Sequence, residues 1–588
     1  MYSFRFIKRF IRERKKKVLI GLVLCLIVIL PTFVYLEKNK NTLIHNKYIY
    51  NKYVWALMPA YRSLKNFVDK APNILYLPKM KSDVGIPDYQ LIIKEYDLKK
   101  LNDNLPSPFI DGVFVGFPEL TNQFQKPVPA KFITGGQEYK VEVSYRGDHS
   151  NHWTKEKKSW EITFDKDNLF NGVKVIKLII PESREYFAEY LNSYRAKKFG
   201  LKPAETSFVS LKVNNKNYGV YYQFEDLSKE FLEKNELPAD ANMYVTNDDI
   251  INLNKQNSAS NDVMFWKKQT SDKIFNYDNY SEVDFLLSLQ DKNEFSDILP
   301  NIVNLDNFYN WNVLSVLAGS SHQCDKGNWR IYFNNSSGKF EFIPWDVKIR
   351  PAVNDKVIDN ILVGKILSDP RREYKRDQVL WGYVSEEKNL ADDLKAYDQI
   401  YDKLKPAFYA DWTKTNNNYK FDEYVKRIRQ DFIDIFNNTK QLFLNDHSNL
   451  NVSYQQSKKL INIDLTVDNF SGLILKSIIL PFGNFFDQAE LYYDSNGDGE
   501  LTAADIFIAR ATLSEKDQQF LFNNLNQFFF SQRVYQEDIK QSSLVPQKHT
   551  LFIKLNNYSN SIPESLDVNR AELQFVNAVT KKAVQVKK

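Results

Sequence analysis

Residues 18–36 form an uninterrupted apolar run, VLIGLVLCLIVILPTFVYL, with no charged side chain in 19 positions. At about 1.5 Å per residue, a helix of this length spans roughly 28 Å, close to the thickness of a bilayer's hydrocarbon core. A cleavable signal peptide is the alternative, but its apolar region would be shorter and a small-x-small cleavage site would follow. The sequence has no such site here. We therefore expect an uncleaved transmembrane helix.

The basic charge of the chain is concentrated before this run. Residues 1–17 carry eight basic side chains and one acidic side chain, and the remaining residues sum to −1, although the whole chain has a net charge of +6. By the positive-inside rule the basic segment stays in the cytoplasm and the bulk of the chain lies outside. We expect a single-pass protein of the cell membrane and no nucleic-acid partner.

The length and composition predict several folded parts. With 588 residues, 43% hydrophobic and 14% aromatic, the chain can bury two or three cores. We expect a cytoplasmic tail (1–17), a transmembrane helix (18–36), a juxtamembrane stalk (37–85), an α+β domain (86–446) and a β-rich domain (447–588). Cys25 and Cys324 do not form a disulfide framework.

The pattern of residues 86–446 indicates a bilobal α+β plan. Its first part alternates in strand fashion, with a hairpin turning at Gly135-Gly136 and a second at an Asn-rich turn. One helix is expected within 183–200, ending at its glycine. Residues 283–320 and 373–445 have mainly helical periodicity. A β-rich lobe followed by an α-rich lobe differs from a βαβ repeat.

A predicted hairpin carries the most informative polar residues. The segment 322–348, HQCDKGNWRIYFNNSSGKFEFIPWDVK, contains two short strands joined by an NNSSG turn. Because paired strands return to their starting point, Asp325, Asn328 and Asp346 should converge at one end. Two carboxylates and an amide oxygen suit Mg²⁺ bound with phosphate groups. The alternative is an ordinary polar hairpin end.

Three stretches together resemble the spore-coat protein H (CotH) kinase-like family, an atypical branch of the protein-kinase fold. They are SYRGDHSNHWTKEKKSWEITF (144–164), NSYRAKKFGLKPAETSFVSLKVNNKNYGVYYQFEDLSKEFLEKN (192–235) and HQCDKGNWRIYFNNSSGKFEFIPWD (322–346). The resemblance extends over roughly residues 87–445. It implies a bilobal domain that binds ATP with Mg²⁺ or Mn²⁺.

The resemblance also implies roles for individual residues. Asp325 would orient or deprotonate the acceptor hydroxyl, as the catalytic residue. Asn328 and Asp346 would hold the metal that bridges the nucleotide phosphates. Lys158 would pair with those phosphates. Lys157 is the alternative, because only one of two adjacent strand residues can face inward.

Further residues of the ATP site follow from the same resemblance. Glu189 in the first-lobe helix would pair with the lysine, and Glu185 is the alternative. Glu225 would lie near the lobe junction, where the base of the nucleotide packs. No Gly-rich phosphate loop precedes Lys158, so Gly135-Gly136 and Arg146-Gly147 are the candidates for close backbone approach to the nucleotide.

Two features raise alternatives to catalysis by this site. The family commonly has a second acid two residues after the first in PWD-x-D, whereas this chain has Lys348. A lysine there would weaken metal binding or replace its charge. His322 and Cys324 flank Asp325, and we expect a hydrogen-bonded histidine and a buried thiol in preference to a nucleophile pair.

Residues 494–505, DSNGDGELTAAD, match an EF-hand-type calcium loop. Its oxygen ligands would come from Asp494, Asn496, Asp498, the backbone of Glu500, and Asp505. A solvated turn is the alternative. Because there is no second loop and the preceding AELYYD is typical of a strand, we expect one structural Ca²⁺ in a β-sandwich-like domain and not a paired dockerin.

The sequence thus predicts a membrane-anchored kinase outside the cytoplasm. It would transfer phosphate from ATP to Ser or Thr of a surface or envelope protein. The alternative is a non-catalytic cell-surface adhesion or scaffold protein built on the same fold.

Overall fold

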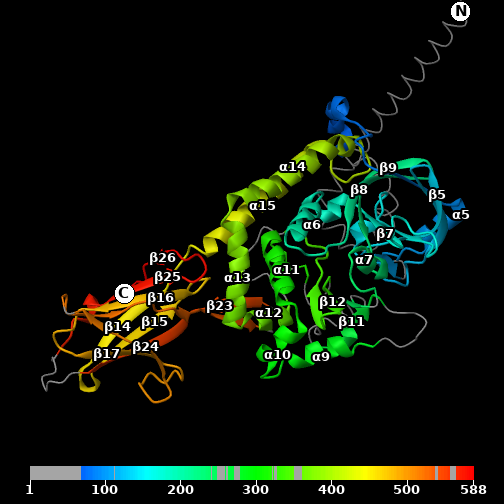
Figure 1. The fold of residues 1–588 in the computed structure, drawn as a ribbon. Helices are drawn as coiled ribbons and strands as arrows, with labels where there is room; N and C mark the ends of the chain where they lie inside the picture. The colour runs from blue at the N-terminus through cyan, green and yellow to red at the C-terminus, as the bar shows by residue number, and fades with distance from the viewer. Residues whose placement is uncertain are drawn as a thin grey trace, which may run out of the picture.

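The computed structural model describes residues 68–110, 113–114, 116–239, 241–247, 259, 262–270, 279–320, 322–323, 328–349, 360–514, 516–536, 541–556 and 565–587. The predicted transmembrane span and Asp325 lie outside these residues. Within them, no helix is both long enough and apolar enough to cross a membrane. A barrel lobe, a helical lobe and a β-sandwich follow one another across the molecule (Figure 1).

The first lobe is a closed β-barrel with the strand order β1-β4-β5-β6-β7-β9-β8. Parallel pairing of β1 with β8 closes it, and the other pairs are antiparallel. Its interior is aromatic and aliphatic, with Phe132, Phe164 and Leu178 fully buried. The strands are β1 (Asp88–Ile92), β4 (Val128–Thr134), β5 (Gln137–Tyr145), β6 (Trp160–Phe164), β7 (Val175–Ile179), β8 (Thr206–Val213) and β9 (Lys216–Glu225).

Both predicted hairpins of this lobe are present. Asn214 and Asn215, between β8 and β9, have φ of 47° and 65°, which asparagine tolerates better than most residues. Gly135 and Gly136 make the equivalent turn between β4 and β5. The lobe also carries α5 (Glu95–Asp103), the short pair β2 (Phe109–Ile110) and β3 (Val113–Phe114), and the 3₁₀ turn η3 (Ser150–His152).

The predicted helix of 183–200 is shorter than expected. A 3₁₀ turn, η4 (Pro181–Arg184), is followed by two left-handed residues, Glu185 and Tyr186, before α6 (Ala188–Lys198) begins. The helix ends before Gly200, whose φ of 70° reverses the chain. Helix α6 lies between the lobes, packed on α11 and α14.

The second lobe combines helices with a small sheet of order β11-β10-β12-β13. Its strands are β10 (Asn242–Thr246), β11 (Trp266–Lys268), β12 (Arg330–Asn334) and β13 (Lys339–Phe342). Its helices are α7 (Lys229–Lys234), α9 (Ser281–Leu289), α10 (Phe295–Ile302), α11 (Leu305–Ala318), α12 (Ile361–Leu367) and α13 (Pro370–Val384), with the 3₁₀ turn η5 (Val263–Phe265). Helix α11 is buried along most of its length, so it lies in the core of this lobe.

Two long helices, α14 (Glu387–Ala410) and α15 (Asn418–Leu442), run from the barrel toward the sandwich (Figure 1). The apolar face of α15 has helical spacing, with Phe421, Val425 and Phe432 buried. Part of the expected stalk, the 3₁₀ helix η2 (Ala71–Lys79), packs against both helices.

The C-terminal residues form the expected β-rich domain, in which two sheets enclose one core of fully buried side chains such as Ile463, Leu475 and Ile553. One sheet contains β14 (Asn449–Gln455), β15 (Leu460–Val467), β24 (Gln547–Asn556), β17 (Gln488–Tyr493) and β18 (Ile506–Arg510). The other contains β19 (Thr512–Ser514), β20 (Gln519–Phe522), β16 (Leu473–Leu480), β25 (Glu572–Asn577) and β26 (Ala583–Val584), with β21 (Gln527–Phe529) beside β16. The hairpin of β22 (Gln532–Gln536) and β23 (Gln541–Val545) contacts α12 of the second lobe.

Candidate nucleotide and metal site

The hairpin of β12 and β13 forms as predicted and brings two of its flanking residues together. Residues Ile331 and Phe342 pair across the ladder, so the chain returns to its starting point. His322 Nδ1 lies 3.1 Å from the Asn328 side-chain nitrogen and 3.0 Å from Asp346 Oδ2. Both side chains therefore lie within hydrogen-bonding distance of the same imidazole nitrogen. The hydrogen-bonded role expected of His322 is confirmed, whereas Cys324 lies outside the described residues.

Both of these residues adopt an uncommon backbone conformation. Asn328 has a φ of 59° and Asp346 a φ of 50°, in the left-handed region. Asn and Asp tolerate this region better than other non-glycine residues, but it still costs free energy. Such residues cluster at functional sites, where the surrounding structure holds them in place.

Asp346 is buried among positively charged side chains. Its Oδ1 forms an ion pair with Arg184 Nη1, and its Oδ2 lies 3.8 Å from the Lys348 ammonium, beside His322. Asp346 Oδ1 and Arg184 Nη1 are buried, yet neither makes a hydrogen bond of good geometry. Each carboxylate oxygen of Asp346 therefore faces at least one basic side chain.

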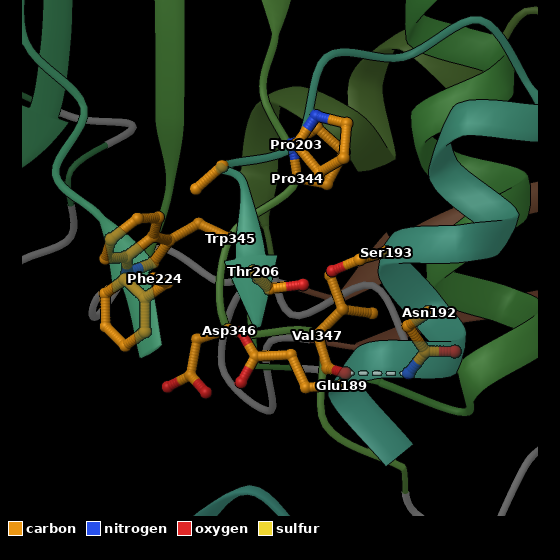
Figure 2. A pocket seen from close by; sticks show the side chains of 11 residues that line it. Glu189, Asn192, Ser193, Pro203, Thr206, Phe224, Pro344, Trp345, Asp346 and Val347 are labelled. Atoms are coloured by element: carbon orange, nitrogen blue, oxygen red, sulfur yellow. Dashed lines mark hydrogen bonds between the residues drawn. The ribbon is translucent and has the colours of Figure 1, made fainter. Parts of the chain in front are cut away.

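Helix α6 holds the segment around Asp346 in place. Glu189 Oε2 lies 3.1 Å from Arg184 Nε. The Asn192 side chain donates to the carbonyl of Val347 at 2.7 Å (Figure 2). Glu185 Oε2 accepts from the backbone N–H of Ile349 at 3.0 Å, and burial raises the pKa of Glu185.

A pocket opens between α6, the start of β8 and the segment that carries Asp346. Figure 2 shows the Glu189 and Asp346 carboxylates on its wall, with the rings of Phe224 and Trp345 beside them. Those rings meet edge to face, with centroids 5.1 Å apart. Apolar walls with a few convergent polar groups are typical of small-molecule sites.

Arg146 lies at the same aromatic wall. Its guanidinium is 5.4 Å from the centre of the Phe224 ring, and that of Arg184 is 5.6 Å away. Burial lowers the pKa of His152, and the charges of Arg146, Arg184 and Lys348 lower it further. The three cations therefore share one region of the protein.

Neither of the two predicted lysines lines this pocket. Strand β6 begins only at Trp160, so neither lysine is a strand residue as expected. Lys157 Nζ is buried, 2.6 Å from Asp411 Oδ2 and 2.7 Å from the Val220 carbonyl. Lys158 Nζ donates to the Lys155 carbonyl at 2.6 Å. Within the described part of the chain, neither lysine forms an ion pair with a carboxylate of the pocket.

Glu225 occupies the end of β9, in a second pocket. It is buried, accepts from the backbone N–H of Glu205 at 2.8 Å and lies 3.3 Å from Lys234 Nζ. This second pocket shares Thr206 with the first. Glu225 is therefore near the Asp346 pocket but not in it.

A model of the family described as CotH kinase protein matches residues 143–461, more than half of the chain. The chain belongs to the CotH kinase protein family. It is also similar to the inner spore coat protein H of Bacillus subtilis (strain 168), with 24% identity over 383 residues, which cover 60% of this chain and 98% of that protein. A crystal structure of the Helicobacter pylori proinflammatory kinase CtkA aligns at 15% identity with a TM-score of 0.20, covering 48% of this chain and 94% of that one.

Arg184 is the site residue that the sequence of this CotH protein did not indicate. Five positions separate it from Glu189, and side chains so spaced do not face each other on a regular α-helix. The left-handed residues Glu185 and Tyr186 between them make the contact possible. No local sequence pattern marks such a turn, because both residues are ordinary in a helix.

The chemistry of the site fits a hard divalent cation. Asp346 offers a buried carboxylate, which pairs with Arg184, and Asn328 offers an amide whose nitrogen lies 3.1 Å from His322 Nδ1. Mg²⁺ and Mn²⁺ prefer such oxygen ligands and keep others from phosphate and water.

The predicted calcium loop follows β17. Asp494 is buried and accepts from the N–H groups of Gly497 and Gly499 at 2.7 and 3.0 Å. Asp498 accepts from Glu500 N–H at 2.8 Å, and Asp505 from Thr502 N–H at 2.6 Å. Across the described residues, no three His, Cys, Asp or Glu side chains are grouped to hold a metal ion. Calcium binding is thus not shown.

Proposed function

We propose that this CotH family member is a membrane-anchored protein kinase that acts outside the cytoplasm. It transfers the terminal phosphate of ATP to a Ser or Thr hydroxyl of a surface or envelope protein. The observation that carries the proposal is the placement of Asn328 and Asp346 on one imidazole nitrogen of His322, beside the Arg184–Glu189 ion pair.

Each residue has a role in this proposal. Asn328 and Asp346 hold Mg²⁺ or Mn²⁺, which neutralises charge on the nucleotide phosphates when bound. Asp325 is the general base, assigned from the CotH motif. The acceptor oxygen forms a bond to the terminal phosphorus, the bond from that phosphorus to the leaving ADP oxygen breaks, and the hydroxyl proton passes to Asp325.

The proposed location rests on the first 36 residues. The basic segment 1–17 and the apolar run 18–36 have the order and length of a single-pass anchor with a cytoplasmic N-terminus. The remaining chain then faces the surface or envelope, where its substrate protein would lie.

We also propose that the loop 494–505 binds one structural Ca²⁺. The buried carboxylate of Asp494 and the close return of Asp505 to the start of the loop support it. Calcium should raise the melting temperature of the wild-type chain but not of Asp494→Ala. An equal response, or none, in the two chains would refute this calcium site.

A non-catalytic scaffold is the second candidate, and one observation favours it. The Asp346 carboxylate faces Arg184 on one oxygen and both His322 and Lys348 on the other. Positive groups at both oxygens compete with a metal ion for the carboxylate. In this case the chain would serve as a surface adhesion or scaffold protein.

Phosphate transfer distinguishes the two. Full-length protein in detergent micelles is incubated with Mn²⁺ and ATP labelled on the terminal phosphate, alongside Asp325→Ala and Asp346→Ala. Asp402→Ala, at an exposed carboxylate of α14, is the matched control. We expect labelling by wild type and the control that both site variants lose. Absence of labelling in wild type, or equal labelling in all four, favours the scaffold.

A further inference from the structure

Glu189, the acid that we expected to pair with a lysine, pairs with an arginine instead. Glu189, at the start of α6, lies 3.1 Å from Arg184 Nε, and Arg184 Nη1 forms an ion pair with Asp346. Arg184 therefore joins the helix acid to the candidate metal ligand. In a phosphotransfer site, this is where a cation can reach both the metal and the phosphates.

The lysines are committed to other partners. The Lys157 side chain is 3% exposed, and its ammonium pairs with Asp411 and donates to the Val220 carbonyl. Lys158 Nζ donates to the Lys155 carbonyl and lies 5.6 Å from the centre of the Tyr145 ring. Releasing Lys157 would leave Asp411 charged, buried and without its ion pair, which is strongly unfavourable.

The backbone fixes Arg184 in its position. Its side chain is 8% exposed, in a 3₁₀ turn closed by a hydrogen bond from Tyr186 N–H to the Pro181 carbonyl at 2.8 Å. The left-handed Glu185 and Tyr186 then redirect the chain into α6. A site residue held this way needs little reorganisation to bind a ligand.

The donors of Arg184 face two carboxylates: Nε lies 3.1 Å from Glu189 Oε2, and Nη1 forms an ion pair with Asp346 Oδ1. Arg146 presents a second guanidinium on the same Phe224 ring. A planar guanidinium binds phosphate oxygens through two parallel N–H donors, which a lysine cannot do.

We propose that Arg184, assisted by Arg146, is the residue that binds the nucleotide phosphates, and that neither Lys157 nor Lys158 has this role. This inference rests on the proposed nucleotide-binding function. It names the phosphate-binding residue of that site, and both arginines lie over Phe224, a residue of the pocket wall.

Nucleotide binding tests this directly. Full-length protein in detergent micelles is titrated with a fluorescent non-hydrolysable ATP analogue and with fluorescent adenosine, in the presence of Mn²⁺. We expect Arg184→Met to weaken binding of the triphosphate by about 10- to 100-fold while adenosine binding changes little. Arg184→Lys should keep part of the affinity, because it keeps the charge but loses the paired donors.

Controls separate this inference from the function on which it rests. Lys158→Met and the surface variant Arg429→Met should bind the analogue like wild type, and melting temperatures without nucleotide check that each variant folds. If Arg184→Met does not fold, Arg184→Lys carries the test. If Lys158→Met loses affinity for the ATP analogue while Arg184→Lys binds it like wild type, the inference is overturned but the kinase proposal stays intact. A wild-type protein that binds no nucleotide would overturn both.

Discussion

Lys157 and Asp411 form a buried ion pair between two distant parts of the chain. Lys157 Nζ lies 2.6 Å from Asp411 Oδ2, and the two side chains are 3% and 0% exposed. Lys157 precedes the barrel strand β6, whereas Asp411 caps the end of α14. Asp411 also accepts from Val220 N–H at 3.2 Å. The pair therefore connects the barrel to the long helices.

Lys157→Met should destabilise the fold without removing a group that takes part in catalysis. Removing one partner of a buried pair leaves an uncompensated charge, which costs about 3–5 kcal/mol in the free energy of unfolding. Urea denaturation measures the loss. Any activity loss in this variant should follow its folded fraction.

Two variants check this interpretation. The double variant Lys157→Met with Asp411→Leu removes both charges and should recover part of the lost stability. Lys158→Met, one position along, should change the free energy of unfolding by less than about 1 kcal/mol. Equal stability of Lys157→Met and wild type would contradict a structural role for Lys157.

Lys414 gives the fold a pH dependence of its own. Burial lowers its pKa from the usual 10.5 to about 8, and the nearby Lys70 and Lys157 charges act in the same direction. Between pH 8 and 10.5 the unfolded chain binds more protons at this lysine, so its contribution to folding stability rises with pH.

The measurement is urea unfolding of wild type and Lys414→Met at pH 7.5 and pH 9.5. The stability of wild type relative to the variant should increase by roughly 1–3 kcal/mol between these values. Lys405→Met, an exposed lysine of α14, is the control and should show no such change. If the difference in stability between wild type and Lys414→Met stays constant or falls as the pH rises, the pKa of Lys414 is not lowered.

Lys348 should weaken metal binding at Asp346. Its ammonium lies 3.8 Å from Asp346 Oδ2, and a like-charged metal ion at that oxygen would be repelled by about 1–4 kcal/mol, depending on the local dielectric. Lys348→Met should therefore tighten Mn²⁺ binding by about fivefold or more, measured by calorimetry with a bound ATP analogue. Lys348→Arg keeps the charge and should resemble wild type. Weaker binding by Lys348→Met would show that the ammonium supports the site.

The C-terminal sandwich should unfold together with the second lobe. Arg533 of β22 binds Glu373 of α13 through Nε at 2.7 Å and Nη2 at 2.5 Å, and its side chain is 1% exposed. Arg533→Met should cost about 3–5 kcal/mol. The control is the ion pair of Arg510 with Glu490, in which the arginine side chain is 63% exposed, and Arg510→Met should cost less than about 1 kcal/mol. Two separate thermal transitions in wild type would contradict this coupling.

The features that could be predicted from the sequence are local ones. Asn214-Asn215 and Gly135-Gly136 mark their hairpins by residue type, and the helical spacing of α15 predicts its buried face. The strands on both sides of NNSSG likewise place Asn328 and Asp346 together.

The contacts that could not be predicted link residues far apart in sequence. Asp411 lies 254 positions from its partner Lys157, and nothing near KKS signals a buried carboxylate. The parallel pairing that closes the barrel, between β1 and β8, is similarly distant. Arg184 escaped prediction for another reason: two ordinary residues adopt left-handed conformations that only the tertiary structure imposes.

The central claim is that Asn328 and Asp346 form a metal and nucleotide site. Its most direct measurement is a crystal structure of the protein with Mn²⁺ and a non-hydrolysable ATP analogue, with the metal located by its anomalous scattering. We predict a manganese peak bound by Asp346 and Asn328, with the phosphates against Arg184. Manganese and nucleotide found elsewhere, or no manganese at saturating concentration, would contradict it.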